Sequence, residues 1–400
     1  MTDVLIDMSA LNTESRERGI GRYVRSLCST LAKRQQWLGN YPGLAGANLT
    51  LSGLTRHRGQ PEGSQDPSLT FGGDYGIQTQ GLHYQRHKLE RRLFMGGLLK
   101  RSGSRLVHLP DPPGTPIDRR QPRIVTCHDL IPLMLGAPYL LPVPGARALQ
   151  RARDQARYKT ALRVIAISEA TRRDLVSELD IPAEHIDVVH HGVDHERFHP
   201  RSQDDERAQM EQALGLDGPF LLYMGAGDAR KNLPLLVRSY AQSRARSQVA
   251  LVLAGPLSKR QRERLGHVID ECGVAQQVKL LGFVDEQWLA PLYRHCRAHV
   301  FPSSYEGFGL TLLEGMACGA PTLTTAFSSL GEVAGDAALT LRELAEEPFV
   351  NALERLVFDE ALQIDLRERG IVHARTFTWE RCAAQTLGCY QRALDQLGPR

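Results

Sequence analysis

Short apolar runs of strand length alternate with amphipathic stretches of helix length along almost the whole chain. This alternation favours parallel sheets, because a chain returning to the same edge of a sheet needs a crossover, usually a helix. Strands are predicted at 4–8, 106–109, 123–129, 163–168, 186–192, 220–225, 249–255, 278–284, 298–303 and 320–325. Helices are predicted between them, among others at 21–34, 168–179, 232–245 and 308–319. The sequence therefore predicts an α/β fold.

The length of 400 residues favours two domains over a single core. The stretch 190–207 separates two runs of the alternating pattern, so we expect domains at 1–200 and 201–378. A last amphipathic stretch, 379–397, follows the second domain and is a candidate to pack back on the first. Residues 39–80 are rich in Gly, Pro, Ser, Thr and Gln, and we expect them to form a mobile excursion of the first domain.

The composition is that of an ordinary globular protein, with 42% apolar and 24% charged residues. No apolar run reaches about 18 residues, and the start of the chain carries acids where a signal peptide has bases. Seven scattered cysteines without a C-x-x-C pair indicate a reducing compartment. We therefore expect a cytoplasmic protein. A net charge of +4 is too small to indicate nucleic acid as a partner.

Two glutamates with a glycine-rich loop between them form the most informative motif. Glu306 follows a predicted strand and Glu314 lies nearly two turns into the next helix. Ligands of parallel α/β sheets bind at the carboxyl edge, where Glu306 is expected, and free N–H groups at a helix start bind oxygens. The alternative is a surface acid and a solvated helix residue. The apolar sequence around Glu314, LTLLEGMACGA, argues against it.

This segment reads S-x-x-E-G-F-G-L-x-x-L-E-x-M-A-x-G-x-P and resembles the large retaining glycosyltransferase family 4. Further stretches similar to the family follow in order: ERGIGRYV, HDLIPLM, VIAISEATRRDLV, VVHHGVD, GAGDARKNL, LVLAG and LLGFVDEQWLAPLY. The resemblance implies the GT-B fold, two Rossmann-like domains facing across a cleft. GIGRY, HDLIP and RKNL together look most like bacterial mannosyltransferases that build surface polysaccharides and lipopolysaccharide.

The resemblance implies a sugar transfer that retains anomeric configuration and needs no metal or cofactor. The donor is a sugar nucleotide, best taken as GDP-mannose, and the acceptor a glycan or lipid-linked glycan. In the family a basic pair clamps the donor diphosphate, and here it is Arg230 and Lys231. Two cations beside a helix start stabilise the negative charge that develops on the leaving group. Many relatives carry an arginine directly after the strand glycine, where this chain has Ala226.

The remaining site residues come from the same resemblance. A histidine at the place of His128 lies near the reacting face of the sugar, and Ser168 is either a similar contact or a helix N-cap. The implied catalytic set is Glu306, His128, Lys231 and Arg230. The implied donor-binding set, with Phe283 and Val284 at the nucleobase, is Gly19, Gly21, Ser168, Gly225, Arg230, Lys231, Phe283, Val284, Gly307, Phe308, Gly309, Leu310 and Glu314.

Other kinds of site were weighed against this one. Two histidine groups show spacings of four residues but offer no convincing three-ligand zinc set, and no D-x-D motif occurs. Val24 replaces the third glycine of a dinucleotide-binding G-x-G-x-x-G, which disfavours an oxidoreductase. A GT-B-type epimerase and a sugar-nucleotide-binding regulatory or inactive protein stay open. The basic stretch 83–101 suits either a peripheral contact with the inner membrane or packing on its own domain.

Overall fold

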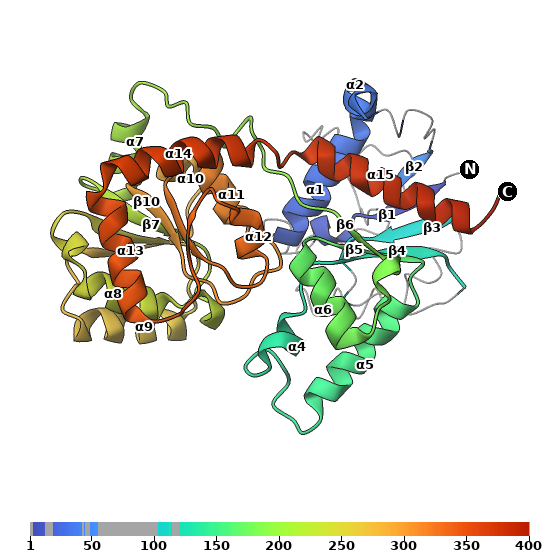
Figure 1. The fold of residues 1–400 in the computed structure, drawn as a ribbon, viewed down its shortest axis with the longest axis horizontal. Coiled ribbons are helices and arrows are strands. Elements are labelled where there is room, and N and C mark those ends of the chain that lie inside the picture. The colour runs from blue at the N-terminus through green and yellow to red at the C-terminus, as the bar shows by residue number, and fades with distance from the viewer. Residues whose placement is uncertain are drawn as a thin grey trace. The chain divides into compact units, whose positions relative to one another are not determined.

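The computed structural model describes residues 3–12, 19–41, 44, 49–54, 103–111, 113 and 120–399. The chain divides into two compact units (Figure 1): unit 1 comprises Met1–Gly192 with Trp379–Arg400, and unit 2 comprises Val193–Thr378. The expected boundary near residue 200 thus moves to Gly192. Val193 N–H donates to the carbonyl of Phe377 at 3.1 Å, and the Phe198 ring packs on Tyr293 at 6.2 Å between centroids. These contacts tie residues 193–200 to unit 2.

Unit 1 is built on a sheet whose described strands are all parallel, in the order β2-β1-β3-β4-β5-β6. The strands are β1 (Val4–Asp7), β2 (Leu51–Leu54), β3 (Leu106–Leu109), β4 (Arg123–Cys127), β5 (Arg163–Ala166) and β6 (Ile186–Val188). The helices are α1 (Gly19–Ala32), α2 (Arg34–Trp37), α4 (Ile131–Leu135), α5 (Ala146–Lys159), α6 (Glu169–Leu179) and α15 (Trp379–Gln396). Short 3₁₀ turns lie at Ser9–Asn12, Leu38–Asn40 and Ala183–His185.

The C-terminal helix α15 is part of unit 1 and packs along α1 (Figure 1). A buried polar chain anchors it to the sheet. The ring nitrogens of His108 lie 2.7 Å from the hydroxyl of Tyr390 and 2.8 Å from that of Thr126, whose Oγ1 is 3.3 Å from the hydroxyl of Tyr23. Since buried polar groups must find partners, this row of hydrogen-bonded side chains specifies how α15 packs on β3 and β4.

Unit 2 repeats the architecture with a parallel sheet in the order β12-β11-β10-β7-β8-β9. Its strands are β7 (Phe220–Met224), β8 (Ala250–Ala254), β9 (Val278–Gly282), β10 (Ala298–Phe301), β11 (Thr322–Thr325) and β12 (Leu339–Leu341). Its helices are α7 (Glu206–Leu214), α8 (Leu233–Gln242), α9 (Lys259–Glu271), α10 (Glu286–His295), α11 (Leu310–Ala317), α12 (Leu330–Ala334), α13 (Glu346–Phe358) and α14 (Glu360–Ala374). Single 3₁₀ turns lie at Ala229–Lys231 (η7) and Arg244–Ser247 (η8).

The ten predicted strands are all present, although most end earlier than expected because the last residues of each run turn into the following loop. Two short edge strands, β2 and β12, were not predicted. β2 corrects the expectation for 39–80, since Leu51–Leu54 pairs with β1 instead of forming a loop. The stretch 83–101 and residues 55–80 lie outside the described residues. No helix in the described ranges is long and apolar enough to cross a bilayer.

Candidate donor-binding site

The strand order of unit 2 marks a site before any side chain is considered. From β7 the chain continues to β8 and β9 on one side of the sheet, and then crosses to β10 on the other side of β7. The connections after β7 and after β10 therefore leave the sheet in opposite directions. Such a switch point at the carboxyl edge is where parallel α/β sheets bind ligands. Arg230 and Lys231 follow β7, and Glu306 follows β10.

Arg230 and Lys231 lie on the 3₁₀ turn η7, and the residue that follows this turn has a left-handed backbone conformation. The Asp228 carboxylate accepts from the N–H of Arg230 at 3.3 Å and starts the turn. Asn232 ends it with φ of 52°, and its side-chain amide donates to the carbonyls of Arg230 at 3.1 Å and Pro302 at 2.9 Å. The Asn232 side chain thereby fixes the turn to the residue that follows β10.

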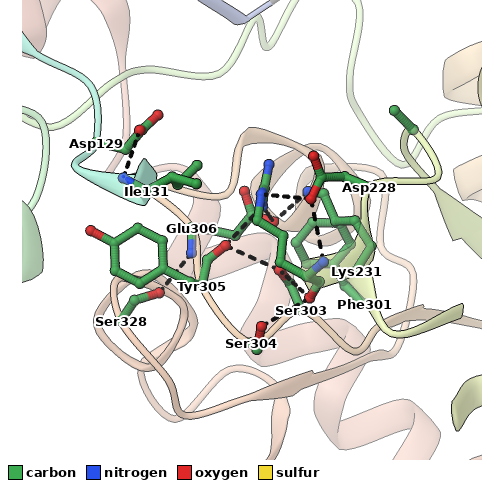
Figure 2. Close-up of polar contacts among 12 residues, drawn as sticks. Asp129, Ile131, Asp228, Lys231, Phe301, Ser303, Ser304, Tyr305, Glu306 and Ser328 are labelled. Carbon is green, nitrogen blue, oxygen red and sulfur yellow. Dashed lines mark hydrogen bonds and ion pairs between the residues drawn. The ribbon is translucent and has the colours of Figure 1, made fainter. Parts of the chain in front are cut away.

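Glu306 is the common partner of both cations. Its Oε1 accepts from Nζ of Lys231 and from the guanidinium of Arg230, and the side chains of Glu306 and Lys231 are both almost fully buried. The same guanidinium donates to the carbonyl of Tyr305 at 2.8 Å, and Lys231 Nζ lies 4.4 Å from the centre of the Phe301 ring. Figure 2 shows these groups converging from the turn after β7 and the loop after β10.

Burial and neighbouring charges both shift the pKa values of Glu306 and Lys231. Burial alone would raise the pKa of Glu306, but the adjacent charges of Lys231 and Arg230 hold that pKa below its usual value. Burial lowers the pKa of Lys231, and repulsion by Arg230 adds to the effect of burial while Glu306 opposes it. The carboxylate of Asp228, 3.5 Å from Nε of Arg230 and only partly buried, is the second anion beside the two cations. Two cations held side by side at this edge are suited to bind a diphosphate that takes the place of one of the carboxylates.

Hydroxyl groups after β11 hold the loop that carries Glu306. Ser328, with φ of 49°, accepts from the N–H of Glu306 at 2.8 Å (Figure 2). The Ser329 hydroxyl donates to the carbonyls of Glu306 at 2.8 Å and Phe308 at 2.9 Å. These bonds fix the backbone on both sides of Glu306, so its carboxylate is positioned by the framework and not by a flexible loop.

The loop continues through Gly307 and Phe308 to Gly309, which precedes the first residue of α11, Leu310. Gly309 has φ of 109°, and a Cβ there would lie 2.9 Å from Cδ2 of Leu330, so only glycine fits without strain. Phe308 is buried. Glu314 is buried within α11 and accepts a long hydrogen bond of 3.5 Å from the hydroxyl of Tyr293. Its burial contradicts the alternative of a solvated helix residue.

The other predicted residues of unit 2 lie along the same carboxyl edge. Gly225 follows β7, and its N–H donates to the carbonyl of Ala254 at 2.8 Å. A Cβ on Gly255 would lie 2.0 Å from the Gly225 carbonyl oxygen, so the ends of β7 and β8 approach closely. After β9, the Phe283 ring is largely exposed and Val284 is buried. The role of these two residues at the nucleobase stays a prediction.

The predicted residues of unit 1 lie at the carboxyl edge of its own sheet. Nε2 of His128 is 2.7 Å from the carbonyl of Pro110, so this nitrogen carries a proton, and burial lowers the pKa of His128. Its ring lies 5.2 Å from that of Tyr23, edge to face. Ser168 caps α6 by accepting from the N–H of Thr171 at 3.0 Å, which explains this serine without a ligand.

Gly19 and Gly21 form the first turn of α1 instead of the loop before it, and residues 13–18 of that loop lie outside the described residues. No group of three metal-ligating side chains occurs in the described part of the chain. Three further site residues, Asn232, Ser328 and Ser329, were not predicted from the sequence. All three form side-chain hydrogen bonds to the backbone of the site, and Asn232 and Ser328 also have a positive φ. Neither feature leaves a spacing pattern in the sequence.

Two parallel-sheet α/β units, one of them with charged side chains at a switch point, are the architecture of the GT-B glycosyltransferases. Residues 42–197 match the family model "Glycosyltransferase Family 4", and residues 204–373 match "Glycosyl transferases group 1". The chain therefore belongs to glycosyltransferase family 4, as its motifs predict. The sucrose-phosphate synthase of Thermosynechococcus elongatus superposes with a TM-score of 0.75 at 21% identity, covering 99% of this chain and 100% of that one. The likeness confirms the predicted fold class.

Two relatives of similar identity to this chain carry names that indicate different substrates. The serotype-specific mannosyltransferase WbdA of Escherichia coli is 30% identical over 278 residues, which are 68% of this chain and 34% of that protein. The D-inositol 3-phosphate glycosyltransferase of Arthrobacter sp. (strain FB24) is 32% identical over 241 residues, 59% of this chain and 57% of that protein. The chain thus matches about a third of the length of WbdA.

Proposed function

We propose that this chain is a retaining, metal-independent glycosyltransferase that moves mannose from GDP-mannose to a glycan or lipid-linked glycan in bacterial polysaccharide synthesis. Membership of family 4 supports the transfer of a sugar from a sugar nucleotide. Similarity to a mannosyltransferase favours mannose, and the relative named for D-inositol 3-phosphate is the reason to test other sugar nucleotides beside GDP-mannose. GDP-mannose is a substrate, and the proposal includes no resident cofactor.

The convergence of Arg230, Lys231 and Glu306 at the switch point is the observation that carries this proposal. In the proposed complex the donor diphosphate takes the place of the Glu306 carboxylate beside the two cations. The positive end of α8, whose first turn follows Asn232, adds to their field. Developing charge on the leaving phosphate is thereby stabilised without a divalent cation.

The reaction that suits this arrangement is a front-side displacement. The acceptor oxygen forms a bond to the anomeric carbon on the face from which the phosphate oxygen departs, and the hydroxyl proton passes to that departing oxygen. Glu306, once displaced from the cations, binds sugar hydroxyls and stabilises positive charge at the ring. Configuration is retained because attack and departure share one face. A covalent glycosyl adduct on Glu306 would contradict this mechanism.

The test is a panel of GDP-, UDP-, ADP- and dTDP-sugars with excess chelator, measured by thermal shift and by release of nucleoside diphosphate. Stabilisation by one nucleotide class, with release that is lost in Glu306→Ala, is the expected result. Glu286→Ala is the matched control, because Glu286 also pairs with an arginine, Arg197, but its side chain is exposed. Binding without release, even with a membrane extract as acceptor source, would instead identify a sugar-nucleotide-binding regulatory protein.

A further inference from the structure

Three neighbouring strands of unit 2 carry no side chain at their carboxyl ends. Gly225 follows β7, Gly255 follows β8 and Gly282 is the last residue of β9, and all three are partly exposed. The N–H of Gly225 donates to the carbonyl of Ala254 at 2.8 Å, and the N–H of Gly255 donates to that of Gly282 at 2.7 Å. Since β7 and β9 are two strand spacings apart, this row of glycines extends about 10 Å from the turn that carries Arg230.

An exposed aromatic ring lies at the far end of the row. Phe283 follows Gly282 directly, and its side chain is 71% exposed, the largest fraction among the large apolar side chains in the described part of the chain. The next residue, Val284, is buried, so this loop is anchored in unit 2. An aromatic ring of this kind can stack on any nucleobase, because every base has a π-face. Phe283 can therefore bind a base but cannot select which one.

The guanidinium of Arg262 lies beside the same strand end. A Cβ on Gly282 would be 3.6 Å from Nη2 of Arg262. The Arg262 side chain is exposed, and within the part of the chain that the structure describes it has no hydrogen bond or ion pair. No acid stands three or four residues away from Arg262 along α9, where helical ion pairs form. Its N–H donors are therefore available to a ligand.

A capping box fixes the start of the helix that carries this arginine. The Ser258 hydroxyl accepts from the N–H of Gln261 at 3.3 Å, and the N–H of Ser258 donates to Oε1 of Gln261 at 2.8 Å. The N–H of Arg262 donates to the carbonyl of Ser258 at 2.9 Å. The backbone of Arg262 is thus held in place next to the end of β9.

We propose that Arg262 selects guanine as the base of the sugar nucleotide, while Phe283 stacks on that base. The inference rests on the proposed function, in which Arg230 and Lys231 bind the diphosphate of the same nucleotide. Guanine presents two acceptors, O6 and N7, side by side, and the fork of an arginine donates to both. Adenine has a donor, its 6-amino group, next to N7, and thymine and uracil have no such pair of acceptors. GDP is therefore the nucleoside diphosphate that fits this arrangement.

The experiment is calorimetric titration of the whole protein with free nucleoside diphosphates in excess chelator, which needs no transfer step. We expect GDP to bind at least about tenfold more tightly than ADP, UDP or dTDP. 7-Deaza-GDP lacks N7 and should bind about fivefold or more weakly than GDP. IDP keeps both acceptors and should bind more tightly than ADP.

Variants separate selection of the base from binding of the phosphates. Arg262→Met keeps the aliphatic stem without the donors, so it should lower GDP affinity about tenfold or more and leave binding of UDP and inorganic pyrophosphate unchanged. Arg262→Lys keeps the charge without the fork and should not restore the preference for GDP. Phe283→Ala should weaken GDP and UDP alike, by about fivefold or more.

Arg264→Met is the matched control. Arg264 is exposed on the same helix and likewise has no hydrogen bond or ion pair of its side chain among the described residues, so the variant should bind as wild type does. A wild type that prefers another base to guanine, or an Arg262→Met variant that keeps the preference for GDP, overturns this proposal and leaves the diphosphate site standing. So does an equal loss of GDP, UDP and pyrophosphate in both Arg262 variants. No binding of any nucleotide or of pyrophosphate by wild type would contradict the donor site itself, and both proposals would fail.

Discussion

The ammonium group of Lys231 and the carboxylate of Glu306 form a buried ion pair that joins the turn after β7 to the loop after β10. Arg230 shares the same carboxylate oxygen. Removing one partner of a buried pair leaves an uncompensated charge, at a typical cost of about 3–5 kcal/mol. Without a ligand, the Glu306 carboxylate pairs with the same two cations that would pair with a bound diphosphate. Binding of the donor and retention of this ion pair compete in the proposed mechanism.

Glu306→Gln tests that competition. The variant removes the anion that Arg230 and Lys231 share and leaves Asp228 beside Arg230. We therefore expect it to bind nucleoside diphosphate about tenfold or more tightly than wild type while transfer falls by about 10²–10³. Calorimetric titration measures the first effect and nucleotide release the second. Glu286→Gln should change neither. Weaker binding of the diphosphate by Glu306→Gln would contradict competition for the two cations.

Substitutions of Asn232 distinguish the contribution of its backbone conformation from that of its side-chain hydrogen bonds. Its φ of 52° costs an L-residue roughly 1–2 kcal/mol, which its two side-chain bonds to Arg230 and Pro302 offset. Asn232→Gly keeps the left-handed turn and loses the bonds, whereas Asn232→Ala loses both. We expect KM for the donor to rise in both variants. The KM of Asn232→Ala should be about fivefold higher than that of Asn232→Gly. A smaller effect of Ala than of Gly would show that the left-handed turn does not position the cations.

Gly309→Ala should disturb the loop between Glu306 and α11. The added Cβ would meet Leu330 at 2.9 Å in a backbone conformation that L-residues rarely adopt. We expect a loss of at least about 1–2 kcal/mol in the free energy of unfolding, together with weaker donor binding. Gly266 in the interior of α9 is the control, because a Cβ there meets nothing within 4 Å. Gly266→Ala should be neutral or stabilising. Equal stability of the two variants would mean that the loop adapts freely.

The stability of the protein should fall below about pH 6.5 because of its buried histidines, of which His108 and His299 are two. Burial lowers the pKa of His108 to about 3 and that of His299 to about 3, from a usual value of 6.5. Between these values the unfolded chain binds the protons and the native state does not, so stability decreases as pH falls. From pH 7.5 to pH 5 each histidine accounts for a loss of about 2 kcal/mol.

Equilibrium urea unfolding at the two pH values measures this loss. His108→Gln keeps an amide able to bond with Tyr390 and Thr126 but cannot titrate, so the loss of stability between the two pH values should be smaller by the share of one histidine, about 2 kcal/mol. His267→Gln, at an exposed position of α9, should show the wild-type dependence. A pH dependence unchanged by His108→Gln would indicate that His108 is not held neutral in the native state.

The alternation of strands and helices predicted the sheets of both units, because buried parallel strands need continuous apolar runs. Glu306, Arg230 and Lys231 were found from motif resemblance, and the structure places them in contact. The edge strand β12 was missed because it is only three residues long and half-buried. Ser328 was missed because its contribution is one bond from the Glu306 N–H, which no sequence period records.

Nucleotide release in excess chelator by wild type, Lys231→Met and Lys259→Met tests the central claim most directly, with the donor that stabilises the protein in the panel above. Lys259 is the matched control because its side chain is 92% exposed, on the N-terminal turn of α9. The account predicts chelator-insensitive release by wild type and Lys259→Met and a loss of at least about 10² in Lys231→Met. Release that requires an added divalent cation, or that persists in Lys231→Met, would contradict a diphosphate site built from protein cations.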